Sequence, residues 1–87
     1  MADYSITFAR SARKELEALS NPLLQRVFSR IESLADSPRP SGCKKLKGSD
    51  DLWRIRIGDY RGIYSINDSL NLVDVIAVRH RSQAYDL

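Results

Sequence analysis

The stretch that decides the fold is WRIRIGDYRGIY, residues 53–64. Apolar or aromatic side chains alternate with arginines on both sides of Gly58 and Asp59, and alternation of this kind is typical of half-buried strands. A two-residue loop with glycine in first place fits a type II′ turn, which joins two antiparallel strands. The stretch therefore predicts a β-hairpin that turns at Gly58-Asp59.

The hairpin register separates the side chains into two faces. The expected pairs on one face are Ile57–Tyr60, Ile55–Gly62 and Trp53–Tyr64, and those on the other face are Arg56–Arg61 and Arg54–Ile63. The first face is apolar and should lie under the helices. Two guanidinium groups directly opposite each other are unfavourable. Either a carboxylate such as Asp59 neutralises them, or the arginines form a site that awaits the charge of a phosphate.

Two helices are expected before the hairpin. Ala12, Leu16 and Leu19 recur at helical spacing. Asn21 fits an N-cap with Pro22 at the first helical position, and the helix that follows should end before Ser37-Pro38. These segments form an antiparallel helical hairpin that must bury its apolar side on a sheet.

The remaining strands complete an α+β domain. Residues 3–8 alternate as a first strand, and 44–47 are expected to form a short strand or an extended entry to the hairpin. Residues 72–78 form a nearly continuous apolar run typical of a buried strand. We expect an N-terminal strand, the helical hairpin and a three- to four-stranded antiparallel meander. Residues 1–87 form a single domain of two layers.

The last strand is expected to pair with the second hairpin strand so that Ile66 lies opposite Leu72. In that register Arg61 lies opposite Ala77, and Arg79 and Arg81 extend the arginine-bearing face. The apolar residues Ile63, Val73 and Val75 would share this face, where the helices do not cover them.

Composition narrows the class of protein. The 87 residues carry a net charge of +3, and ten of the 14 basic residues are arginine, which favours an anionic partner such as nucleic acid. A single cysteine and a single histidine indicate no internal disulfide and no metal site, and no cofactor is expected. No apolar run is long enough for a membrane span and no signal segment is evident, which predicts a cytoplasmic protein without a membrane partner.

Several motifs together resemble a known family. They are Leu46-Lys47-Gly48, the block 53–64, Val78-Arg79-His80-Arg81 and Tyr85, and they resemble the RelE branch of the RelE/ParE toxin superfamily. The resemblance implies a type II toxin that cuts mRNA in the ribosomal A site. It also implies a cognate RelB-type antitoxin, and contact with operator DNA only through the toxin–antitoxin complex.

The resemblance also implies the site residues. The expected catalytic residues are Arg54, Arg56, Arg61, Arg81 and Tyr85. The best-known family member has lysine at the first two of these positions and glycine at the position of Arg79, so the general base is left open. His80 is a further expected catalytic residue, a proton donor or acceptor, because histidine is the side chain whose ordinary pKa lies near neutrality. Further RNA-binding candidates are Lys44, Lys45, Lys47 and Arg79.

Three functional classes remain open at this point. The first is a ribosome-dependent mRNA endoribonuclease, and the second is a ParE-like inhibitor of DNA gyrase with the same fold. The third is an RNA- or DNA-binding module without catalysis, or a decayed toxin. The set of four arginines with Tyr85 favours the first. The apolar residues Ile63 and Val75, beside the cationic cluster, suit an amphipathic segment of an antitoxin.

Overall fold

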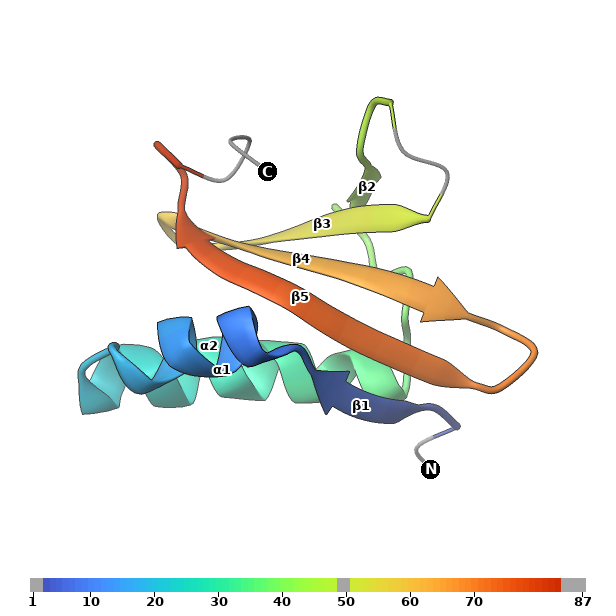
Figure 1. Ribbon diagram of the computed structural model, residues 1–87, viewed down its shortest axis with the longest axis horizontal. Helices are drawn as coiled ribbons and strands as arrows, with labels where there is room; N and C mark the ends of the chain where they lie inside the picture. Colours follow the sequence, from blue (N-terminus) through green and yellow to red (C-terminus); the bar gives the residue numbers. More distant parts are fainter. Residues whose placement is uncertain (1–2, 49–50, 84–87) are drawn as a thin grey trace.

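The structure is a computed structural model that describes residues 3–48 and 51–83. Two helices lie against one face of a five-stranded sheet (Figure 1). The elements are β1 (Ser5–Phe8), α1 (Arg10–Glu17), α2 (Asn21–Glu32), a 3-10 turn η1 (Ser33–Ala35), β2 (Lys44–Lys45), β3 (Leu52–Ile57), β4 (Tyr60–Asn67) and β5 (Leu72–His80). This arrangement confirms the expected α+β class and its two layers.

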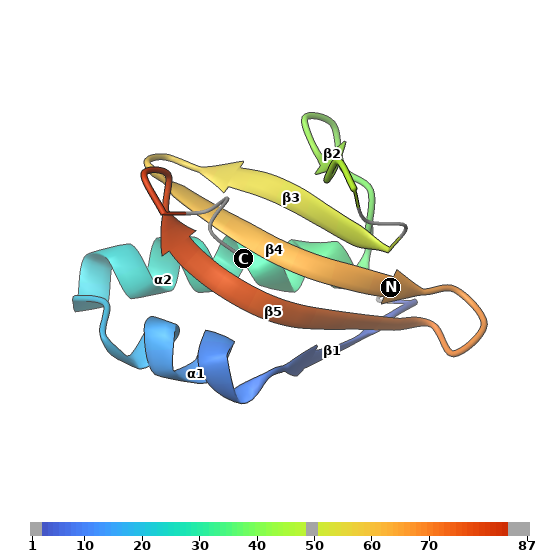
Figure 2. The ribbon, with the colours of Figure 1, turned by 45° about the horizontal axis from the view of Figure 1, so that its top comes forward.

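The sheet has the strand order β1-β5-β4-β3-β2. Strands β2 to β5 pair antiparallel, and β1 pairs parallel with β5, so the first strand lies beside the last (Figure 2). Within the described ranges, no helix is long and apolar enough to cross a membrane.

The β3–β4 hairpin has the predicted register at every pair. Ile57 pairs with Tyr60, and Arg56 pairs with Arg61. Gly58 has a φ of +60°, whereas Asp59 does not have a positive φ, as a type II′ turn requires. The apolar and arginine-bearing faces are therefore separated as the sequence predicts.

The predicted β4–β5 register is wrong. Asn67 pairs with Leu72, one position from the expected pairing, and Arg61 lies opposite Arg79 instead of Ala77. The turn is tighter than expected because the Leu70 N–H donates to the Asn67 side chain and Asn71 adopts a left-handed φ of 51°. A β-bulge then leaves Ile76 between the paired residues and shifts the register again.

The new register changes what the last strand buries. Val73 and Val75 belong to the core beneath the helices, with Val27, Ile31 and Tyr64. Both valines are almost completely buried, so their expected place on an exposed arginine-bearing face is wrong. Ile63 does lie on that face, opposite Arg54, but it is also fully buried. An exposed apolar patch for an antitoxin does not form from these three residues.

The helices begin close to the predicted positions. The N-cap of α2 is Ser20 rather than Asn21, which puts Pro22 within the first turn, where its missing N–H is tolerated. The apolar sides of α1 and α2 carry Ala12, Leu16, Val27 and Ile31 into the core. The opposite face of the sheet carries the arginines together with the buried Ile63 and Ala77.

Candidate functional site

Three arginines lie together on the face of the sheet that the helices do not cover. Arg54 and Arg56 alternate with the core residues of β3, and Arg61 lies opposite Arg56 on β4. Their exposure differs: Arg56 is exposed, whereas Arg54 is only 3% exposed and Arg61 9%. Two guanidinium groups are thus largely removed from water.

These buried guanidinium groups are incompletely satisfied. Arg61 donates from Nη1 to the carbonyls of Gly58 and Tyr60, at 3.1 and 2.9 Å. Its Nε and the Nη1 of Arg54 are buried without a hydrogen-bond partner among the described residues. A buried charge without a partner is unfavourable, and such groups gather at functional sites.

No described carboxylate neutralises this cluster. The two ion pairs within residues 3–48 and 51–83 are Arg39–Asp68 and Arg79–Glu15. The expected alternative, in which Asp59 pairs with Arg61, therefore does not occur. Among the described residues, Arg54, Arg56 and Arg61 therefore form a cationic cluster without an ion-pair partner.

Arg79 joins the same face but is engaged by α1. Its Nε donates to Glu15 at 2.8 Å, and the other oxygen of that carboxylate accepts the Val78 N–H at 3.0 Å. Glu15 thereby completes the edge of β5 where β1 has ended, and Ser11 does the same by donating to the Ile76 carbonyl. The charge of Arg79 is largely compensated, unlike that of Arg54 and Arg61.

The expected C-terminal residues His80 and Arg81 lie at and just beyond the end of β5. His80 pairs with Tyr60, its ring meets the tyrosine edge to face at 5.7 Å, and its Nδ1 lies 3.0 Å from the Ser82 hydroxyl. This is the side of the sheet opposite Arg61. Arg81 is exposed beyond the strand, where its backbone N–H donates to the Asp59 carbonyl. Tyr85 lies outside the described residues, so its role stays a prediction.

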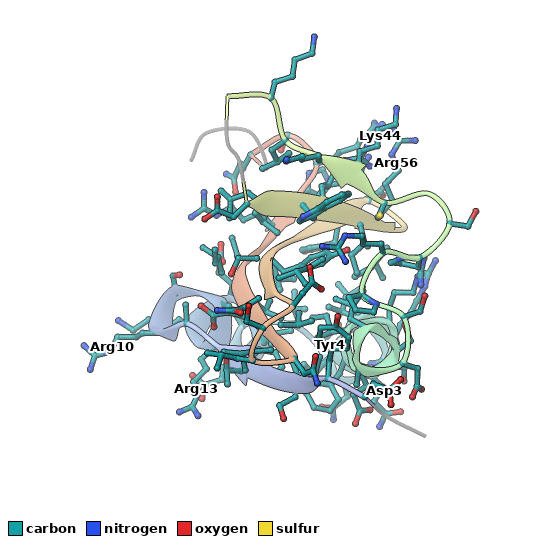
Figure 3. The ribbon with its side chains drawn as sticks, turned by 90° about the vertical axis from the view of Figure 1, so that its right-hand side faces the viewer. Asp3, Tyr4, Arg10, Arg13, Lys44 and Arg56 are labelled. Carbon is teal, nitrogen blue, oxygen red and sulfur yellow. The ribbon has the colours of Figure 1, made fainter. Side chains whose placement is uncertain are left out.

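The three candidate lysines diverge. Lys44 pairs with Arg54 and therefore shares the arginine-bearing face, as Figure 3 shows for its position beside Arg56. Lys45 pairs with Trp53 and faces the other way, and Lys47 is exposed after the strand. Of the three, Lys44 is the one that extends the arginine cluster.

A groove of about 260 Å³ lies at the edge of this cluster. Two parts of its lining, Arg30 and the Ser41-Gly42 segment, are not among the residues predicted from the sequence. Its lining residues are Arg30, Ser41, Gly42, Lys44, Arg54 and Arg56. Nothing in the sequence indicates that Arg30 of α2 reaches the edge of the sheet. The Pro40-Ser41-Gly42 segment, by contrast, carries a proline and a glycine, a sequence signal that indicates a turn.

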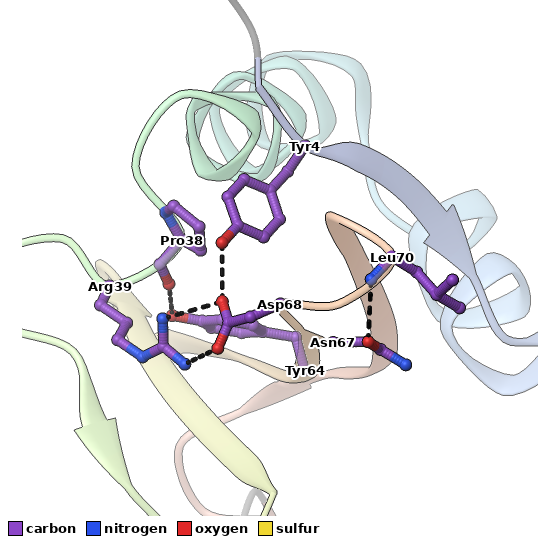
Figure 4. A network of polar contacts seen from close by, with 7 residues as sticks. All are labelled: Tyr4, Pro38, Arg39, Tyr64, Asn67, Asp68 and Leu70. Carbon is purple, nitrogen blue, oxygen red and sulfur yellow. Dashed lines mark hydrogen bonds and ion pairs between the residues drawn. The ribbon is translucent and has the colours of Figure 1, made fainter.

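A polar network fixes the loop that leads into this groove (Figure 4). Arg39 donates to both oxygens of Asp68, at 3.3 and 2.9 Å, and the Tyr4 hydroxyl donates to the same carboxylate at 2.6 Å. Arg39 also stacks over the Trp53 ring, and the Tyr64 hydroxyl donates to the Pro38 carbonyl. The network ties β1, the 38–43 loop and the β4–β5 turn together.

This network predicts a pH dependence of stability. The Arg39 guanidinium and, to a smaller extent, the Tyr4 hydroxyl lower the pKa of Asp68. A carboxyl whose folded pKa is lowered stabilises the fold above its unfolded pKa, and this contribution is lost as pH falls through the folded pKa. Thermal melts of the wild type and Asp68→Asn should differ at pH 7, and the difference should shrink as the pH falls from about 4 through the lowered pKa of Asp68.

The matched control for this prediction is Asp36→Asn. Asp36 is an exposed carboxylate whose side chain makes no such contact among the described residues. Its melting-temperature difference from the wild type should stay small and not vary with pH in the same way. A difference for Asp68→Asn that stays constant from pH 7 to pH 3 would contradict the role given to its charge.

The fold and the arginine-bearing face together define the class of small α+β toxins. The family model described as "ParE toxin of type II toxin-antitoxin system, parDE" matches residues 6–85. The chain belongs to this family and is a type II toxin of the RelE/ParE superfamily. A protein of Methanocaldococcus jannaschii described as a candidate toxin, RelE1, is 28% identical over 85 residues, which cover 94% of each chain.

Solved structures agree with this assignment. The RelE–RelB complex of Pyrococcus horikoshii contains a chain that is 29% identical, with a TM-score of 0.81 over 94% of this chain and 99% of the other. The RelBE2 complex of Mycobacterium tuberculosis gives a TM-score of 0.81 at 28% identity, over 91% and 99%. The Escherichia coli RelBE complex gives 0.78 at 28% identity, over 88% and 95%.

Proposed function

We propose that this toxin is a ribosome-dependent endoribonuclease that cleaves mRNA in the ribosomal A site and so inhibits translation. The observation that carries the proposal is the pair of buried guanidinium groups, Arg54 and Arg61, that lack a carboxylate partner among the described residues. Such a site suits a phosphodiester, because arginine offers both charge and two parallel hydrogen bonds to phosphate.

The arginines suit one part of the reaction. RNA cleavage through the 2′-hydroxyl requires removal of that proton, stabilisation of the crowded phosphate and protonation of the leaving 5′-oxygen. Arg54, Arg56 and Arg61 would position the phosphate and stabilise its developing charge, with Arg81 assisting. Arginine is a poor general base because it stays protonated. The proton transfers remain proposals for Tyr85 and His80, and His80 lies on the other side of the sheet from Arg61.

A RelB-type antitoxin is the proposed partner. The solved relatives from P. horikoshii, M. tuberculosis and E. coli are toxin–antitoxin complexes, which supports a partner of this class. In this proposal the toxin reaches operator DNA only through the antitoxin, whereas the ribosome and mRNA are its direct targets.

We expect the purified toxin, freed from any antitoxin, to cut mRNA only when ribosomes are present. Among the described residues the site offers phosphate ligands but no strong base beside them, so we expect the ribosome to help order the substrate. Primer extension on an mRNA, with and without ribosomes, measures the cleavage. Equally fast cleavage of free RNA would contradict ribosome dependence. Inhibition of DNA gyrase with intact mRNA would favour the ParE-like activity instead.

A further inference from the structure

The groove at the β2–β3 edge has the composition of an anion site. Four of its six lining residues are cationic and none is acidic: Arg30, Lys44, Arg54 and Arg56, with Ser41 and Gly42. They come from α2, the 38–43 loop, β2 and β3. Side chains from α2, β2 and β3 thus bring like charges to one small space.

Arg54 is the member of this cationic cluster whose hydrogen bonds are incomplete. Its side chain lines the groove, the residue is 3% exposed, and its Nη1 has no hydrogen-bond partner among the described residues. The residue opposite it on β2 is Lys44, which adds repulsion instead of compensation. An anion in the groove would lie against the Arg54 side chain and neutralise several charges at once.

The opposite wall of the groove is held in a defined shape. Pro40 to Cys43 form a turn in which the Cys43 N–H donates to the Pro40 carbonyl at 3.1 Å. Gly42 has a φ of +91°, the conformation that the third residue of a type II turn requires. Arg39, one residue before this turn, is held by Asp68 and Trp53. The wall is therefore fixed before any ligand binds.

The groove is distinct from the position of Arg61. Arg61 does not line it, but Arg56 does, and Arg56 pairs directly with Arg61 across the hairpin. Neighbouring strands lie about 4.8 Å apart, so the groove and Arg61 lie on either side of Arg56 at a spacing of this order. The arginine-bearing face thus offers two adjacent places for an anion.

We propose that the groove binds a second phosphate group, the one next to the phosphate that is cleaved beside Arg61, and that Arg54 and Arg56 lie between the two phosphates and contact both. Arg30 and Lys44 are then positioning residues that fix the register of the RNA on the site. This deepens the proposed nuclease function and rests on it for the identity of the ligand. Binding of a singly or doubly charged phosphate by the guanidinium groups of the groove does not depend on the cleavage reaction.

The first experiment uses inorganic phosphate as the probe. Titration of the full chain, followed by NMR of the arginine Nε–H groups, should show saturable shifts at Arg30 and Arg54. Arg30→Gln should weaken this binding at least tenfold. Arg10→Gln is the matched control, because Arg10 is an exposed arginine of a helix on the other side of the molecule (Figure 3) and should bind like the wild type. Shifts that do not saturate, or equal binding by both variants, would overturn the site.

The second experiment separates the groove from the nuclease. On ribosome-bound mRNA, Arg30→Gln should raise KM several-fold and leave kcat within about twofold, because uniform binding is lost while the cleaved phosphate keeps its ligands. An equal fall in kcat with unchanged KM would overturn the positioning role. If the wild type cleaves nothing on ribosomes, the proposed function fails, whereas saturable phosphate binding in the first experiment would still establish the groove.

Discussion

Arg61→Ala should lower the rate of ribosome-dependent mRNA cleavage roughly 100- to 1000-fold, the range found when one donor to a developing oxyanion is removed. Arg61 is the buried arginine whose Nε has no partner among the described residues, so a ligand phosphate is its natural acceptor. Arg61→Lys keeps the charge and loses the planar fork, and its rate should fall between those of the wild type and the alanine variant.

The same variant should remain folded. It loses two hydrogen bonds from Nη1 to the turn carbonyls of Gly58 and Tyr60. It also relieves a desolvated charge that faces Arg56 and Arg79 on the neighbouring strands, so the two effects oppose each other. Thermal unfolding should therefore be measured beside the cleavage rate. A much less stable variant with near-normal cleavage per folded molecule would show that Arg61 is structural.

Val75→Asp should prevent the domain from folding at all. Val75 is 1% exposed and packs in the core with Tyr64 and Ile31, where a carboxylate would have no partner. A buried, unpaired charge costs several kcal/mol, and a domain of this size has a total stability of about 4–13 kcal/mol. Circular dichroism and thermal melts should show loss of the cooperative transition.

The control for this substitution is Leu70→Asp. Leu70 is an apolar residue in the β4–β5 turn and is 70% exposed, so the new charge stays in water. This variant should melt within a few degrees of the wild type. If Val75→Asp also melts near the wild type and only loses antitoxin binding, Val75 must be exposed, and the β4–β5 register described here is wrong.

The sequence predicted the β3–β4 hairpin well because local chemistry determines it. Gly58 selects the turn type, and alternation then assigns each side chain of both strands to a face. The β4–β5 pairing failed for an equally local reason. The turn is closed by Asn67 and Asn71, and the bulge at Ile76 inserts a residue that no alternation pattern reveals.

The candidate site was predictable only in part. Arg54, Arg56 and Arg61 follow from the hairpin, and their common face is confirmed. That Arg54 and Arg61 are buried, and that Glu15 engages Arg79, depends on packing between distant segments. Arg30 was not anticipated, because its place beside the sheet edge depends on how α2 crosses the sheet, which no spacing within the helix specifies.

The parallel pairing of β1 with β5 bears on when during synthesis the toxin can become active. Strand β5 separates β1 from the other three strands, and it supplies Val73, Val75 and Val78 to the core. In a nascent chain that ends before residue 72, β1 therefore has no strand to pair with, and the core lacks the residues that β5 supplies. Contacts between segments so far apart in sequence form late. The sheet that carries the arginine-bearing face can therefore be completed only after β5 has left the ribosome that makes it.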